Sequence, residues 1–236
     1  MVICYVVRNM SFDVNKVETV TVDSYGTLVD PSAVEGRLAD HVDETESIST
    51  LWRSRSILYT MVSNYIDAYQ PFYEMNRDAL VYALEVHDVS LPADMIDEIL
   101  STYHELDVYE DVSDGLELIT DAGFDVFFVS NGNPEMLTSM VEQAEIHSVI
   151  TETISADEIS TFKPSVDIYR HAAARTGTPI ENIAHVAGPS FDVQGAMHAG
   201  MQGVWLDRTG SPWDGFAPDP DLRVESFDEI ADRLVT

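Results

Sequence analysis

Residues 17–30 read VETVTVDSYGTLVD, and this stretch decides the fold. Its first six residues alternate valine with threonine around one glutamate, which is the composition of a buried β-strand. Asp23-Ser24-Tyr25-Gly26-Thr27 follows at once, and its small and polar residues are typical of a turn. We therefore expect a buried strand whose carboxyl end carries polar side chains.

Short runs rich in β-branched and aromatic residues recur along the chain, and stretches with helical periodicity separate them. The expected strands lie at residues 17–22, 125–130, 149–154, 183–187 and 203–207. The expected helices lie at residues 134–145, 164–177 and 192–200, with Pro134 and Pro164 in first turns and Gly177 and Gly200 at C-terminal caps. Strands that alternate with helices predict an α/β fold with a doubly wound parallel sheet.

The region from residue 31 to 112 breaks this alternation, because its periodicity is helical throughout. It follows the first strand and precedes the second, so we predict a helical cap (31–112) inserted into an α/β core made of residues 1–30 and 113–236. The joints are expected near Pro31 and between Asp111 and Gly115. The segment before Met10 is expected to be an extension outside the fold, with Met10 as the natural start.

The charge balance is strongly acidic, with 42 acidic and 12 basic residues and a formal net charge of −30. Such a chain repels itself at low salt, and high salt shortens the screening length to about 3 Å at 1 M. We interpret the composition as adaptation to a salty cytoplasm, rather than as an acidic solvated surface without further meaning. A nucleic-acid partner is not expected, because the sequence has no basic patch. Lys16 and Lys163 are the only lysines.

Several other classes of protein are disfavoured by the sequence. The apolar runs are too short to span a bilayer, and no signal peptide is recognisable. Cys4 is the sole cysteine, so neither a disulfide framework nor a thiolate metal site is expected. The histidines are scattered without ligand spacing, so a zinc site is not expected.

Ligands bind beyond the carboxyl ends of the strands in an open parallel sheet, so the polar residues that follow each strand are the candidate site. These segments are residues 23–27, 130–133, 161–164 and 188–192. They bring two carboxylates, one lysine and several hydroxyl and amide groups to one edge of the predicted sheet.

In these segments the chain resembles the haloacid dehalogenase superfamily and, within it, the L-2-haloacid dehalogenases. The matching stretches are DSYGTLVD (23–30), LWRSRSILY (51–59), VSNG (129–132), FKPSVDIY (162–169) and FDVQGA (191–196). They occur in the family's order and cover nearly the whole chain from Met10. The resemblance implies a Rossmann-like core with a cap, and a homodimer is possible because family members often dimerise through the cap.

The resemblance also implies a reaction and a role for each matching residue. Asp23 would attack C2 of a short 2-halo acid, and water would then hydrolyse the resulting ester to the inverted 2-hydroxy acid. Lys163 would hold Asp23 ionised, and Asp192 would orient or deprotonate the water. The other implied catalytic residues are Thr27 beside the nucleophile, Ser130 at the substrate carboxylate, Arg53 and Asn131 at the departing halide, and Tyr169 in the same polar cluster. Substrate contacts are expected from Ser24 and from the apolar walls Tyr25, Phe72 and Phe191.

Two positions argue against the superfamily's magnesium-dependent phosphatases. These carry an acidic residue two places after the nucleophile and a further aspartate in the fourth motif, where this chain has Tyr25 and Gly188. A halide leaves as a stable anion and needs no proton, so an aromatic residue at position 25 suits dehalogenation. We expect no metal and no other cofactor.

Each candidate also has a structural interpretation. Asp23 would be a turn residue, Lys163 a solvated lysine at a helix start, Arg53 a surface residue, and Asp192 a helix N-cap. Tyr169 would be a core residue that packs on one face of its helix, and the sequence does not decide between this and a role in the polar cluster. Ser130 and Asn131 would shape a turn before a helix, whose amides still form an anion site. His185 lies in a buried strand pattern and is expected to be a core residue with its polar groups satisfied.

The fourth motif departs from the family pattern at two positions. Ala187 and Pro189 stand where the family has a serine and an asparagine that help place the hydrolytic water, and neither side chain forms hydrogen bonds. We therefore expect slow ester hydrolysis or a substrate other than short 2-chloro acids. The rival hypotheses are a phosphatase of the same fold and a binding protein built on a catalytically weakened scaffold.

Overall fold

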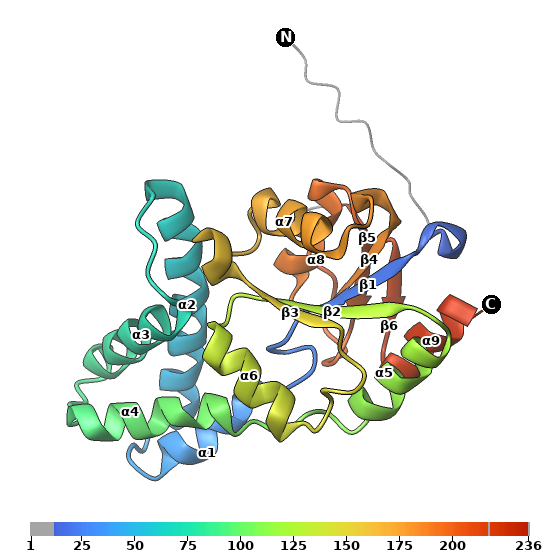
Figure 1. Cartoon of the computed structure of the whole chain (residues 1–236). Coiled ribbons are helices and arrows are strands. Elements are labelled where there is room, and N and C mark those ends of the chain that lie inside the picture. The colour runs from blue at the N-terminus through green and yellow to red at the C-terminus, as the bar shows by residue number, and fades with distance from the viewer. Residues whose placement is uncertain (1–11, 217, 236) are drawn as a thin grey trace.

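The computed structural model describes residues 12–216 and 218–235, so the predictions for the segment before Met10 and for Cys4 lie outside the described residues. At its centre is a six-stranded sheet of order β3-β2-β1-β4-β5-β6 in which all neighbouring strands are parallel (Figure 1). The strands are β1 (Thr19–Val22), β2 (Asp125–Ser130), β3 (Glu152–Ser155), β4 (Ile183–Ala187), β5 (Gln202–Leu206) and β6 (Leu222–Val224). The α/β class with a parallel sheet is confirmed.

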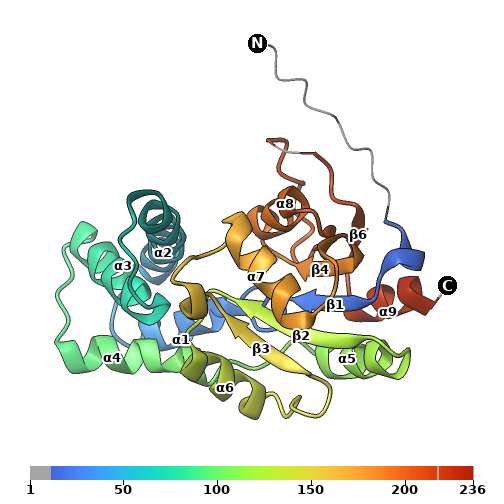
Figure 2. The ribbon, with the colours of Figure 1, turned by 45° about the horizontal axis from the view of Figure 1, so that its top comes forward.

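Helices cover both faces of this sheet, which is why its central strands are buried along their whole length. On one face lie α5 (Val112–Asp121), α6 (Pro134–Gln143) and α9 (Phe227–Val235), and on the other lie α7 (Val166–Thr176) and α8 (Ser190–Ala199) (Figures 1 and 2). Gly115 lies within α5, where a Cβ atom would come 2.3 Å from the Phe227 Cβ of α9. The close packing of these two helices therefore requires glycine at position 115.

The helical region between β1 and β2 lies beside the sheet, at the side where α6 and β3 also lie (Figure 1). It consists of α1 (Val34–Ala39), α2 (Thr45–Ile66), α3 (Phe72–Val86) and α4 (Ala93–Ser101). The chain enters and leaves this region side by side, because Val29 and Val108 form an antiparallel bridge and the Tyr109 amide donates to the Leu28 carbonyl. None of the helices in the described ranges combines the length and the apolar character needed to cross a membrane.

Two details of the predicted helices are wrong. Pro164 lies before the N-cap of α7, which is Ser165, whereas Pro134 does occupy the first turn of α6. Helix α8 begins at Ser190 with Pro189 as N-cap and not at the predicted residue 192, so the alternative interpretation of Asp192 as an N-cap is also excluded. Gly177 and Gly200 end their helices in the left-handed conformation, as expected.

Candidate active site

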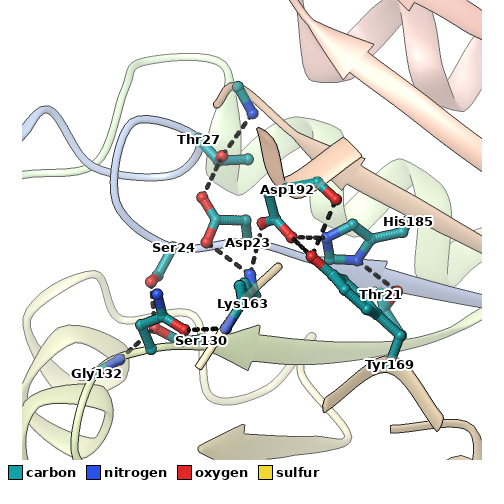
Figure 3. A network of polar contacts seen from close by, with 12 residues as sticks. Thr21, Asp23, Ser24, Thr27, Ser130, Gly132, Lys163, Tyr169, His185 and Asp192 are labelled. Carbon is teal, nitrogen blue, oxygen red and sulfur yellow. Dashed lines mark hydrogen bonds and ion pairs between the residues drawn. The ribbon is translucent and has the colours of Figure 1, made fainter. Parts of the chain in front are cut away.

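The polar residues that follow β1, β2 and β4 meet at the carboxyl edge of the sheet (Figure 3). Asp23 directly follows β1, Ser130 ends β2, and Asp192 lies in the first turn of α8 after β4. Lys163 reaches them from the segment before α7. Because β1 is central and paired with both β2 and β4, the turn after β1 lies in the middle of this edge.

Lys163 links the two carboxylates. Its Nζ atom donates to Asp23 Oδ1 at 2.8 Å and to Asp192 Oδ2 at 2.6 Å (Figure 3). The exposed fractions of the three side chains are 2% for Lys163, 10% for Asp23 and 1% for Asp192. A buried ammonium between two buried carboxylates excludes the surface interpretation of Lys163, and the slight exposure of Asp23 leaves its carboxylate open to the site.

Burial disfavours the charged forms of these three side chains, whereas the ion pairs between Lys163 and each aspartate favour them. Burial raises the pKa of the Asp23 carboxyl; the Lys163 ammonium counteracts the rise, and the Asp192 carboxylate adds to it. Burial also opposes ionisation of Asp192, but Lys163 and His185 together hold its pKa well below the usual range. The two carboxylates outweigh the effect of burial on Lys163 and raise its pKa. The ammonium is therefore the group that favours an ionised Asp23.

Asp192 has two further partners besides Lys163. The Tyr169 hydroxyl donates to Asp192 Oδ1 at 2.6 Å and lies 3.0 Å from its backbone carbonyl, and His185 Nε2 lies 3.1 Å from the same Oδ1. A Cβ atom on Gly195 would come 2.6 Å from the Tyr169 hydroxyl, so glycine at this position admits the phenol. His185 is buried with both ring nitrogens in contact with partners, as expected, but its contact with Asp192 was not predicted.

The turn after β1 holds the second oxygen of Asp23. Thr27 Oγ1 donates to Asp23 Oδ2 at 2.7 Å and accepts from the Gly188 amide at 2.8 Å. The turn reaches this geometry through Gly26, whose φ of 82° lies in the left-handed region that favours glycine. Thr27 thus ties the loop after β1 to the loop after β4.

A second polar group lies beside Asp23, at the end of β2. The hydroxyls of Ser24 and Ser130 are 2.6 Å apart, and the Gly132 amide donates to Ser130 Oγ at 3.0 Å. Asn131 turns its side-chain oxygen to the Lys163 backbone amide at 2.9 Å and so anchors the lysine-bearing segment. These hydroxyls and amides form a neutral donor group next to Asp23.

Aromatic rings enclose the site on the side of the helical region. Tyr25 stacks on Phe72 with ring centroids 6.3 Å apart and meets Tyr103 edge-on at 5.6 Å, and Phe72 contacts Phe162 at 6.3 Å. Burial raises the pKa of Tyr25, and its hydroxyl has no hydrogen-bond partner among the described residues. Tyr25 therefore contributes its ring faces to this wall, together with a hydroxyl that no described residue engages. Tyr103 and Phe162 were not predicted as part of this wall.

Two predicted residues have no hydrogen bond, ion pair or ring contact with the cluster in the described part of the chain. Arg53 donates to Glu35 at 2.7 Å and to Ser49 at 2.6 Å, within the helical region. Its charge nevertheless acts on Tyr103, which packs against Tyr25. Phe191 is half-buried at the second position of α8, without a ring contact to Tyr25 or Phe72.

Position 188 cannot carry a metal-binding side chain without a backbone change. A Cβ atom on Gly188 would come 2.2 Å from the Gly26 carbonyl oxygen, in the turn that holds Asp23. Among the described residues no group of three or more acidic, cysteine or histidine side chains is arranged to hold a metal ion. The positive charge between the two aspartates is that of Lys163.

This close approach makes Gly188→Ala a test of the turn. The added methyl group must displace the Gly26 carbonyl, and we expect a loss of about 1–3 kcal/mol in unfolding free energy, which is typical of overpacking. Gly36→Ala is the matched control, because nothing lies within 4 Å of its Cβ position in α1. Thermal unfolding of both variants checks this. Equal melting temperatures of the Gly188→Ala and Gly36→Ala proteins would contradict the close contact.

Comparison with known proteins agrees with the motif analysis. Residues 17–200 match the family of haloacid dehalogenase-like hydrolases. The chain is 32% identical to (S)-2-haloacid dehalogenase 4A of Burkholderia cepacia, over 80% of this chain and 83% of that protein. It is 30% identical to (S)-2-haloacid dehalogenase 1 of Pseudomonas sp. strain CBS-3, over 90% of this chain and 94% of that protein. A crystal structure of an L-2-haloacid dehalogenase superimposes with a TM-score of 0.90 at 26% identity, covering 93% of this chain and 99% of that one.

Proposed function

Because this chain belongs to the haloacid dehalogenase-like hydrolases, we propose that it removes halide from a short (S)-2-haloalkanoic acid through an ester on Asp23. The observation that carries the proposal is the buried contact of Lys163 Nζ with the carboxylates of Asp23 and Asp192. One carboxylate is thereby held ionised as a nucleophile, with a second beside it. The product is the 2-hydroxy acid.

In the first half-reaction a carboxylate oxygen of Asp23 forms a bond to C2 from the side opposite the halogen. The carbon–halogen bond breaks, and the halide leaves with the bonding electron pair. No proton is needed, which fits a site whose residue 25 is an aromatic wall rather than an acid. Lys163 and Thr27 orient the two oxygens of the nucleophile before attack.

In the second half-reaction water attacks the carbonyl carbon of the Asp23 ester. Asp192 accepts or directs the proton of this water, and the bond between the carbonyl carbon and the alkyl oxygen breaks. The alcohol oxygen takes up a proton, and Asp23 returns to its carboxylate form. The configuration at C2 is inverted once, in the first step, because the second step does not touch this carbon.

The other predicted residues complete the proposal. The Ser24 and Ser130 hydroxyls and the amides that follow β2 would receive the substrate carboxylate, since they form a donor group beside Asp23. Tyr25 and Phe72 would contact the alkyl part, with Phe191 as a further wall. Arg53 and Asn131 would receive the halide; this requires the Arg53 guanidinium to turn from Glu35 towards Tyr103 and the site.

Chloride release and intact-protein mass, measured with each enantiomer of 2-chloropropionate, test the proposal. We expect chloride from the (S) enantiomer, a transient mass increase that corresponds to the ester, and no magnesium requirement. Magnesium-dependent hydrolysis of p-nitrophenyl phosphate without chloride release would favour the phosphatase of the same fold. Binding of the haloacid without adduct or chloride would identify a catalytically weakened protein, the outcome that Ala187 and Pro189 would explain.

A further inference from the structure

His185 is a buried titratable group at the centre of the sheet. It lies in the middle of β4, is fully buried, and stands opposite Thr21 of β1 in the parallel register. Its Nδ1 atom lies 2.9 Å from Thr21 Oγ1, and its Nε2 atom lies 3.1 Å from Asp192 Oδ1 (Figure 3). The ring therefore bridges the central strand and the carboxylate proposed to activate water.

These partners define the tautomer of the ring. An ionised carboxylate can only accept hydrogen bonds, so the proton of a neutral His185 lies on Nε2 and is donated to Asp192. The Nδ1 atom then has a lone pair and accepts from the Thr21 hydroxyl.

The end of β4 and the loop that follows it contribute no side-chain donor next to Asp192, because Ala187 ends the strand and the loop consists of Gly188 and Pro189. In the described part of the chain, the side chains that contact the Asp192 carboxylate are those of Lys163, Tyr169 and His185. Lys163 divides its ammonium between two carboxylates. Tyr169 and His185 therefore fix the direction of Oδ1.

We infer that His185 is a positioning residue for the second half-reaction: its Nε2–H group holds the Asp192 carboxylate in the orientation that activates the hydrolytic water. This inference rests on the proposed function. Esterification removes the negative charge of Asp23, so Lys163 then attracts Asp192 alone. The hydrogen bonds to Oδ1 oppose a turn of that carboxylate towards the ammonium. His185 is accordingly needed for hydrolysis of the ester, whereas formation of the ester does not depend on it.

Two amide substitutions of His185 distinguish the contribution of its Nε2 atom from that of its Nδ1 atom. In His185→Gln the side-chain amide reaches the position of Nε2 and keeps a donor to Asp192. In His185→Asn the shorter amide reaches only the position of Nδ1 and keeps a partner for Thr21. Both variants place a neutral amide in the same buried site, so a general effect of burying an amide appears in both.

Rapid-quench kinetics with (S)-2-chloropropionate measure the two steps, chloride release in the first turnover and decay of the Asp23 ester by intact mass. We expect His185→Asn to release the first chloride at the wild-type rate, and to hydrolyse the ester roughly 10- to 100-fold more slowly, the scale of a misplaced reacting group. His185→Gln should hydrolyse the ester within about threefold of wild type.

Three outcomes would overturn the inference: equal ester decay in His185→Asn and wild type, equal slowing in both variants, or slowing of chloride release alone. Absence of chloride from wild type would instead overturn the proposed function, and the inference with it. If His185→Asn fails to fold, Thr21→Val carries the test. Loss of the donor to Nδ1 should slow ester decay several-fold and leave chloride release unchanged, and unchanged ester decay would overturn the inference.

Discussion

Asp23→Asn should abolish halide release, with a fall in rate of roughly 10⁴- to 10⁶-fold, as when a covalent nucleophile is removed. An amide oxygen is a far weaker nucleophile than the carboxylate that Lys163 and Thr27 orient. No ester can form on the substituted side chain by the proposed route, so the mass increase with (S)-2-chloropropionate should also disappear. Chloride release and intact mass, measured on the same samples, check both expectations.

The control for this variant is Asp167→Asn, which makes the same change of charge at an exposed position in the first turn of α7. It should keep the wild-type rate. Thermal unfolding of Asp23→Asn should show a folded protein, because Lys163 keeps Asp192 as an ionised partner. Haloacid turnover by a folded Asp23→Asn protein at the wild-type rate would contradict the assignment of the nucleophile.

Lys163→Met should have the second largest effect, on both activity and stability. Without the ammonium, two buried carboxylates face each other with no positive charge between them. Removing one partner of a buried ion pair costs about 3–5 kcal/mol in unfolding free energy. The halide release rate should fall by on the order of 10³-fold, because Asp23 becomes largely protonated. Lys16→Met is the matched control, since Lys16 is an exposed lysine beside Asp13.

The stability loss of Lys163→Met should depend on pH. In the wild-type protein the lowered pKa of Asp192 contributes stability above the unfolded value of about 3.9, and this is lost as the pH falls through the folded value. The raised pKa of Lys163 contributes stability below about 10.4, and this is lost as the pH rises through the folded value. The pair of Lys163 and Asp192 therefore stabilises the fold between these two limits, whereas the raised pKa of Asp23 subtracts stability above about 3.9.

In the variant the facing carboxylates bind protons more tightly when folded than when unfolded. The loss of unfolding free energy relative to wild type should consequently grow as the pH rises above about 4, and it should shrink as the pH is lowered towards about 4. Denaturant unfolding at several pH values measures this. A deficit that stays constant with pH would show that lost packing, rather than unpaired charge, explains the destabilisation.

The sequence predicted the central part of the fold because burial on both faces leaves a distinct pattern. β2 and β4 have the predicted bounds, since apolar residues dominate both strands and nearly all of their residues are buried. β6 was not predicted, because it is only three residues long and includes the exposed Arg223. Helix α9 was also omitted from the prediction, although apolar residues recur along it at helical spacing.

The site residues that follow strands could be predicted because a parallel sheet brings the carboxyl ends of its strands to one edge. His185 was not linked to the site, because its contact depends on how the short loop after β4 directs Asp192 back over the strand. Tyr103 and Phe162 depend on how the helical region lies against the sheet, which no local pattern reveals. The Glu35 partner of Arg53 depends on the same packing within that region.

A single turnover in water enriched in oxygen-18, with enzyme in excess over (S)-2-chloropropionate, tests the central claim most directly. If Asp23 bonds to carbon and water attacks the ester carbonyl, the lactate formed carries ordinary oxygen in its hydroxyl group, and the heavy oxygen appears in the peptide that contains Asp23. Lactate that carries the heavy oxygen in its hydroxyl group, beside an unlabelled Asp23, would show direct attack of water on C2 and would contradict the account.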